Sequence, residues 1–206
     1  MAGRRGRVGG LVLAAGLSHR FGGAKLLASF RGRALIGHVL DVAAAARQRG
    51  VLAETCVVAA AGDDAVATLA RASGTTVALN PDPARGLSSS LRVGLAAMPQ
   101  DVDAALLLLG DQPLVRLEVI EALVRAWRTC TSEVVRPRYA GSSRSPGHPV
   151  LISRAAWLLA ERLEGDSGFG SLFASGVATV TVIDVAGDNP DVDTPADLLS
   201  LKDPPT

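Results

Sequence analysis

The chain has 206 residues, of which 48% are hydrophobic, 20% are charged and only 3% are aromatic, and its formal net charge is +1. This length suits one domain with a single sizeable core. The near-neutral charge excludes a global field that recruits nucleic acid or an anionic membrane, and the scarcity of rings argues against a base-stacking surface. An anionic ligand must therefore be held by a local cluster of basic side chains.

Short apolar runs alternate with amphipathic helical patterns, which is typical of βαβ units around a largely parallel sheet. In the first half, the pattern predicts strands at Val8–Ala14, Thr55–Ala60, Thr76–Leu79 and Asp103–Leu109, and helices at Ala34–Arg49, Asp63–Ala72 and Ser88–Met98. The last of these strands lacks polar alternation, as expected for a strand that is covered on both faces.

The rhythm weakens in the second half of the chain. A helix is predicted at Leu117–Thr129, strands at Glu133–Arg136, Pro149–Ile152 and Ala178–Val185, and further helices at Ser153–Leu163 and from Pro195 onward. We therefore expect an α/β fold of three layers, with a mostly parallel sheet and a small antiparallel substrate lobe. Residues 1–202 are expected to form one domain, followed by a disordered tail at 203–206.

Two features indicate the compartment. Cys56 and Cys130 are too few and too far apart for a metal site or a disulfide framework, which favours a reducing environment. Three arginines near the N-terminus precede the apolar stretch Val8–Leu17 and imitate a short secretory signal. Because two glycines break that stretch, we expect a cytoplasmic protein, and no segment approaches the roughly 20 apolar residues that span a bilayer.

The first predicted strand ends in a loop of small residues that is followed by two basic ones. Ala14, Ala15 and Gly16 let backbone N–H groups approach a phosphate chain without interference from large side chains. Arg20 and Lys25 add positive charge against a triphosphate and a departing pyrophosphate. The spacing is neither that of the Walker P-loop nor that of the dinucleotide fingerprint. A plain structural turn with solvated basic side chains stays open as the alternative.

Carboxylates supply the second kind of candidate residue. Asp111 follows the predicted strand Asp103–Leu109, and ligands gather at the carboxyl ends of strands in open α/β sheets. A carboxylate there can reach a metal ion bound to phosphates, or it can cap the turn that follows. Asp191 and Asp193 form a second acidic cluster, and each can be a metal ligand or a helix-start signal beside Pro195.

Together these residues resemble a known family, the MobA-like NTP transferases. The similarity rests on Leu13-Ala14-Ala15-Gly16-x-Ser18-x-Arg20-x-Gly22-x-x-Lys25, on Gly110-Asp111-Gln112-Pro113 and on Asp193-Thr194-Pro195. It runs from Val12 to Leu198 and is strongest to the molybdenum cofactor cytidylyltransferase branch. The resemblance implies a Rossmann-like nucleotidyltransferase fold, with a nucleotide-binding half at 1–115 and an acceptor-substrate half at 116–202.

The resemblance also implies a reaction, in which a substrate phosphate attacks the α-phosphorus of a nucleoside triphosphate and pyrophosphate leaves. Asp111 and Asp193 would hold Mg²⁺, for which Mn²⁺ can substitute, and the catalytic residues would be Arg20, Lys25 and Asp111. Such transfer depends mainly on positioning and charge stabilisation. The nucleotide-binding residues implied in this way are Leu13, Ala14, Ala15, Gly16, Ser18, Arg20, Lys25, Asn80, Ser88, Ser89 and Asp111.

The choice of base is indicated by Ala15. The cytidylyl branch resembles this chain in having Leu-Ala-Ala-Gly, whereas the guanylyl branch typically has Leu-Ala-Gly-Gly. A Cβ at Ala15 narrows the base pocket and disfavours a purine, so CTP is the expected donor and GTP the alternative. Simple helix capping is the other interpretation of the serines that begin the helix Ser88–Met98.

The acceptor site is implied by Gln112, Gly147, His148, Pro149 and Asp166, which resemble family elements that shape a pterin site. Relatives often continue the second Gly-Asp element with Gly-Ala-Arg, where this chain has Gly168-Phe169-Gly170. One anchoring charge is therefore missing unless Arg136, Arg138 or Arg144 replaces it.

A phosphorylated pterin of the molybdopterin type is the expected acceptor. The alternatives are another small phosphorylated metabolite and, in a different class, a nucleotide- or cofactor-binding chaperone without activity. The expected partners are the small-molecule substrates, with a transient cofactor-delivery protein or an acceptor molybdoenzyme in addition. Neither nucleic acid nor a membrane is expected to bind.

Overall fold

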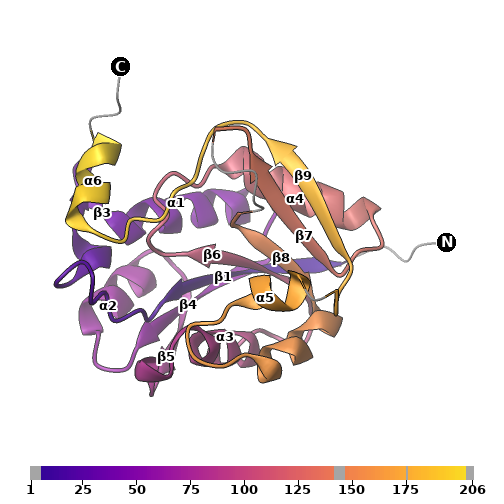
Figure 1. Ribbon diagram of the computed structural model, residues 1–206, viewed down its shortest axis with the longest axis horizontal. Helices are drawn as coiled ribbons and strands as arrows, with labels where there is room; N and C mark the ends of the chain where they lie inside the picture. Colours follow the sequence, from indigo (N-terminus) through magenta and orange to yellow (C-terminus); the bar gives the residue numbers. More distant parts are fainter. Residues whose placement is uncertain (1–5, 142–146, 175, 203–206) are drawn as a thin grey trace.

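The computed structural model describes residues 6–141, 147–174 and 176–202, so Arg144 and the expected tail at 203–206 lie outside the described residues. Seven strands form one sheet in the order β5-β4-β1-β6-β8-β7-β9 (Figure 1). Their bounds are β1 Arg7–Ala14, β4 Glu54–Ala60, β5 Thr76–Asn80, β6 Val102–Leu109, β7 Val134–Tyr139, β8 Val150–Ser153 and β9 Val180–Val185. Only β8 runs antiparallel to its neighbours in this sheet, which confirms the expected mostly parallel arrangement.

Helices cover both faces of the sheet and complete the expected three layers (Figure 1). One face packs against α1 (Leu35–Gln48), α2 (Asp64–Ala72) and α4 (Leu117–Thr129). The other packs against α3 (Leu87–Ala96), the 3₁₀ helix η3 (Arg154–Arg162) and the short helix α5 (Phe169–Ala174). Two further 3₁₀ turns, η1 (Lys25–Leu27) and η2 (Pro83–Arg85), follow strand ends, and α6 (Pro195–Lys202) ends the described chain.

The apolar run in β6 is explained by this layering. Leu106 and Leu108 are directed to the face covered by α1 and α4, and Leu107 is directed to the face covered by α3. Each of the three is at most 3% exposed. A strand that is buried on both faces needs no polar alternation, which is why the sequence predicted this element well.

A small antiparallel sheet that no strand pattern indicated lies between the first loop and α1. Its strands are β2 (Ser29–Phe30) and β3 (Arg33–Ala34), joined through Arg31 and Gly32, both with positive φ, as a tight two-residue hairpin turn requires. The small antiparallel sheet therefore lies in the first half of the chain. The strands of the second half belong to the main sheet, which they enter where β8 pairs with β6.

The β2–β3 hairpin supports the end of the chain. Phe30 and Leu35 pack with Val192 and Leu198 in a separate apolar cluster, so α6 lies against β2 and the start of α1 (Figure 1). This cluster fixes the segment before α6 against the first half of the molecule. Among the helices of the described residues, none has the length and apolar content needed to cross a membrane.

Candidate active site

A cavity of about 610 Å³ opens where β1 and β6 end. In an open α/β sheet this edge is where ligands bind, because loops and helix starts converge there. Its lining comes from the loop after β1, the start of α3, the end of β6 and the segment before α6. The residues are Leu13, Ala14, Ala15, Gly16, Leu17, Ser18, His19, Arg20, Lys25, Leu26, Pro83, Ala84, Gly86, Leu87, Ser90, Leu109, Asp111, Asp166, Asp191 and Asp193.

The most distinctive feature of the cavity is a lysine between two carboxylates. The Nζ atom of Lys25 lies 2.6 Å from Oδ2 of Asp111 and 3.3 Å from Oδ1 of Asp193. Arg20 reaches the other oxygen of Asp193, with 3.0 Å between its Nη2 and Oδ2. Lys25 is only 9% exposed, and its charge at this depth requires such compensation. The structure thus brings together the four residues that the sequence proposed for phosphate and metal binding.

This donor set fits a divalent cation that is shared with a phosphate chain. Carboxylate oxygens of Asp111 and Asp193 already converge on one positively charged atom, Nζ of Lys25. Mg²⁺ is usually held by one or two carboxylates together with substrate phosphates, so these two side chains are sufficient protein ligands. In the ranges that the structure describes, no group of three or more His, Cys, Asp or Glu side chains is arranged as a self-contained metal site.

Asp193 is fixed on one side by the start of α6. The carboxylate of Asp197 accepts hydrogen bonds from the backbone N–H groups of Asp193 (3.0 Å) and Thr194 (2.7 Å), and the hydroxyl of Thr194 accepts one from the N–H of Asp197 (3.2 Å). This reciprocal pairing is a capping box. The hydrogen bonds with Thr194, together with the one from the N–H of Asp193 and the charge of Arg20, lower the pKa of Asp197. The cap of α6 thus uses the side chains of Thr194 and Asp197, and the Asp193 carboxylate is left to contact Lys25 and Arg20.

Asp191 is the third carboxylate of the cavity. Burial raises its pKa, and the negative charge of Asp111 adds to that effect, while a hydrogen bond from Gln112 acts in the opposite direction. The amide Nε2 of Gln112 donates to Oδ1 of Asp191 at 2.8 Å. Through this hydrogen bond, and through the contact of Lys25 with Asp193, the loop after β1 and the segment 188–193 meet at the end of β6.

The proposed nucleotide residues separate into two groups. Leu13, Ala14, Ala15, Gly16 and Ser18 line the cavity beside the charged cluster, and Ser18 adopts a positive φ of 54° in the loop. Asn80, Ser88 and Ser89 do not line it.

The side chains of this second group are used for packing. The amide of Asn80 donates to the hydroxyls of Ser89 (2.8 Å) and Ser90 (3.0 Å), and the hydroxyl of Ser88 donates to the carbonyl of Arg85 at 3.4 Å. All four polar side chains are buried. The helix-capping interpretation of the serines is wrong, because Gly86 is the N-cap of α3 and no side chain among the described residues caps this helix; the Ser88 and Ser89 hydroxyls donate to backbone carbonyls instead. Among these serines, Ser90 is the one that lines the cavity. It lies one helical turn after Leu87, which also lines the cavity, and this shared helix face is the signal by which the sequence could have indicated it.

The proposed acceptor residues are only partly gathered. Asp166 lines the cavity, but Gly147, His148 and Pro149 do not. Gln112 is 5% exposed and both ends of its amide are hydrogen-bonded to protein side chains. Burial, followed by the charge of Arg136, lowers the pKa of His148 to about 4.

The segment that replaces the expected Gly-Ala-Arg is used for packing. Phe169 is 4% exposed, and its ring stacks on Phe173 with 5.6 Å between centroids. Arg138 pairs with Asp184 at 2.7 Å on the surface, whereas the guanidinium of Arg136 lies over the Phe173 ring at 5.7 Å. Of the two described candidates for the anchoring charge, Arg136 is the one that lies beside this segment.

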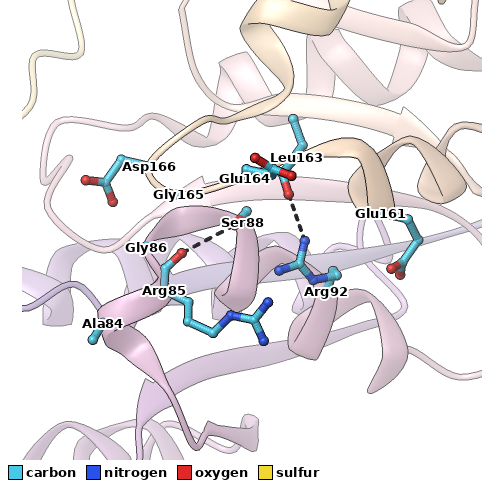
Figure 2. Close-up of a pocket in the computed structure, with 10 residues that line it drawn as sticks. All are labelled: Ala84, Arg85, Gly86, Ser88, Arg92, Glu161, Leu163, Glu164, Gly165 and Asp166. Carbon is cyan, nitrogen blue, oxygen red and sulfur yellow. Dashed lines mark hydrogen bonds between the residues drawn. The ribbon is translucent and has the colours of Figure 1, made fainter.

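A second cavity of about 540 Å³ borders the first one (Figure 2). The two share Ala84, Gly86 and Asp166. Gly86 has a φ of 79°, and a Cβ there would lie 2.4 Å from the carbonyl carbon of Gly165, so only glycine fits this contact. The N–H of Ser88 donates to the carbonyl of Gly165 at 3.0 Å, so the loop that carries Asp166 is held against the start of α3.

A parallel sheet with a small-residue loop after β1, basic residues in that loop and converging carboxylates at the same edge defines a nucleotidyltransferase. The family model of the MobA-like NTP transferase domain matches residues 10–180. The chain therefore belongs to the MobA-like NTP transferase family.

Two curated relatives are cytidylyltransferases. The molybdenum cofactor cytidylyltransferase of Escherichia coli (strain K12) is 24% identical over 193 residues, which cover 94% of both chains. The 3-deoxy-manno-octulosonate cytidylyltransferase of Anaeromyxobacter sp. (strain Fw109-5) is 41% identical over 110 residues, which cover 53% of this chain and 42% of that protein.

A similar solved structure is that of Rv0371c from Mycobacterium tuberculosis H37Rv, with 34% identity, a TM-score of 0.82, and coverage of 95% of this chain and 98% of the other. The same protein has been solved in complex with manganese, at 32% identity, a TM-score of 0.80 and coverage of 96% and 99%. These relatives support transfer of the CTP type and a divalent metal in the family.

Proposed function

We propose that this protein transfers a cytidylyl group from CTP to a phosphorylated pterin of the molybdopterin type and releases pyrophosphate. The observation that carries the proposal is the cluster of Arg20 and Lys25 with Asp111 and Asp193 in one wall of the cavity. A purely binding module needs the basic residues but has no use for a pair of carboxylates beside a triphosphate.

In the proposed reaction, an oxygen of the acceptor phosphate forms a bond to the α-phosphorus of CTP, and the bond to the bridging oxygen of the β-phosphate breaks. That oxygen leaves on pyrophosphate with its electron pair. Lys25 and Arg20 hold the triphosphate and offset the charge that builds on the leaving group. Asp111 and Asp193 would hold Mg²⁺, or Mn²⁺ in its place, and the bound ion supplies further positive charge against the phosphates.

Two observations support cytosine as the base. Ala15 lines the cavity with 3% exposure, so its Cβ occupies space that a glycine would leave to a larger base. Both curated relatives described above are cytidylyltransferases. GTP remains the alternative donor, and it requires a wider pocket at the same position.

A second acceptor is favoured by one specific observation. Gly170 stands at the position where a charged anchor was expected, and its neighbour Phe169 is buried against Phe173. Another small phosphorylated metabolite therefore stays as the alternative acceptor, with the same donor chemistry. The pterin proposal instead requires another arginine to hold the acceptor, and of the described candidates Arg136 is the one that lies beside Phe173.

The test is thermal unfolding with CTP, GTP, UTP and ATP, each with and without Mg²⁺, followed by pyrophosphate release with candidate acceptors. A ligand at 100 times its Kd stabilises the fold by about 2.7 kcal/mol. Protection by CTP only when Mg²⁺ is present is the expected result, and protection by GTP alone would contradict the base assignment. Asp111→Asn should abolish turnover and retain the fold; unchanged turnover would remove Asp111 from the site.

A further inference from the structure

Behind the metal-binding carboxylates lies a chain of buried amides that connects the end of β6 to the segment before α6. Gln112 directly follows Asp111 and is 5% exposed. Its Nε2 donates to Asp191 at 2.8 Å, and its Oε1 accepts from Nδ2 of Asn189 at 3.0 Å. Both ends of this one side chain thus hold the segment from residue 189 to residue 193.

The backbone adds a further attachment at the same place. The N–H of Val192 donates to the carbonyl of Asp111 at 3.1 Å, and the Val192 side chain is fully buried with Phe30 and Leu198. Asp193 follows at once, so its carboxylate is delivered next to that of Asp111. The two carboxylates come from distant parts of the chain and share the Lys25 ammonium, so their spacing depends on that ion pair together with these attachments.

We infer that Gln112 is a positioning residue that sets the distance between the two metal-binding carboxylates, rather than a residue that contacts the acceptor. The inference rests on the proposed function, because it concerns the metal that Asp111 and Asp193 would share. Loss of the amide leaves Asn189 and Asp191 without their buried partner, and the segment can then shift away from the end of β6. Groups that orient metal ligands in this way typically change metal affinity by about 10- to 100-fold when removed.

The test measures metal binding without turnover. Mn²⁺ is titrated into the protein with cytidine 5′-(α,β-methylene)triphosphate bound, and free Mn²⁺ is followed by electron paramagnetic resonance. Gln112→Leu, which keeps the volume and loses both hydrogen bonds, should weaken Mn²⁺ binding by at least about tenfold. Gln112→Asn, which keeps an amide but not its reach, should change the affinity in the same direction and provides a second variant if the first does not fold.

The matched control is Thr75→Val. The Thr75 hydroxyl donates a buried hydrogen bond to Ala70 at 2.7 Å before β5 begins, at the sheet edge opposite the cavity. The Thr75→Val variant should lower the melting temperature as the Gln112 variants do and leave the Mn²⁺ affinity unchanged. Unaltered Mn²⁺ affinity in both Gln112 variants, or a rise only in the KM of the acceptor, would overturn the inference. If the unmodified protein binds no Mn²⁺ with the CTP analogue, the proposed function itself fails, and the inference with it.

Discussion

Replacing Lys25 with methionine removes the positive charge that two carboxylates share. The lysine Nζ contacts Asp111 at 2.6 Å and Asp193 at 3.3 Å, while its side chain is 10% exposed. Loss of one partner from a buried ion pair costs about 3–5 kcal/mol. Here the side chains of Asp111 and Asp193 retain 22% and 34% exposure, so water compensates part of the loss.

We therefore expect Lys25→Met to lower the free energy of unfolding by about 2 kcal/mol in the absence of metal. For a domain of this size, that corresponds to a fall of roughly 4–8 °C in melting temperature. Because a divalent cation can take the place of the ammonium between the carboxylates, Mg²⁺ should restore part of the stability. Pyrophosphate release should nevertheless fall by at least about 100-fold, since no other residue replaces the lysine against the phosphates.

The control is Arg33→Met, which removes an exposed ion pair of 2.6 Å with Asp41. Such a surface pair contributes about 0–1 kcal/mol, so the control should unfold nearly as the unmodified protein does. Differential scanning fluorimetry with and without Mg²⁺ gives both comparisons. A Lys25→Met protein that melts with the control and keeps half of its turnover would refute the assignment of Lys25 to the centre of the site.

Three further outcomes are expected. Ala15→Gly should raise kcat/KM for GTP relative to CTP by about tenfold, because removal of the Cβ widens the pocket by one carbon; an unchanged ratio in nucleotide competition assays would exclude Ala15 as the base selector. Gly86→Ala should lower the free energy of unfolding by more than about 1 kcal/mol in urea denaturation, since the new Cβ would meet Gly165 at 2.4 Å. The control Gly62→Ala, at φ 91° with open space around it, should lower the free energy of unfolding only through backbone strain. His148 has a pKa of about 4 in the folded protein against 6.5 for the free side chain, so the unfolded chain takes up the proton first. The free energy of unfolding should therefore fall by about 3 kcal/mol as the pH drops from 6.5 to 4. His148→Gln should flatten this dependence of stability on pH, and an equally steep curve in the variant would exclude the histidine as its cause.

Much of the fold could be predicted because burial and periodicity agree in the central elements. β6 is covered on both faces, and α4 places Ile120, Leu123 and Trp127 in the core at helical spacing, so their patterns are unambiguous. Ser153–Leu163 was predicted as a helix, and the observed element is the 3₁₀ helix Arg154–Arg162, which has the tighter winding that a sequence pattern does not distinguish.

The β2–β3 hairpin escaped prediction because its strands have only two residues each. Its turn residues Arg31 and Gly32 carry the only local signal, and arginine rarely adopts the positive φ that it has here. The short helix α5 was also missed, since Gly168-Phe169-Gly170 was interpreted in terms of an acceptor site, whereas Phe169 packs on Phe173 within this helix.

The candidate site divides in the same way. Arg20, Lys25, Asp111 and Asp193 carry a spacing that indicates chemistry, and the structure links them through the ion pairs Arg20–Asp193, Lys25–Asp193 and Lys25–Asp111. The role of Gln112 was not visible, because its partners depend on how the last segment folds back on the sheet. The family resemblance suggested a contact of Gln112 with the acceptor, whereas in the structure its amide is hydrogen-bonded to Asn189 and Asp191.

The distance along the chain between Lys25 and Asp193 has a consequence for synthesis. These two members of the charged cluster are 168 residues apart, and the N-terminal one emerges from the ribosome first. The loop and Asp111 belong to the part of the chain from β1 to the end of β6, whereas Asp193 and the α6 cap that orients it follow only after β7, β8 and β9. The charged cluster is therefore completed only after those three strands have been synthesised.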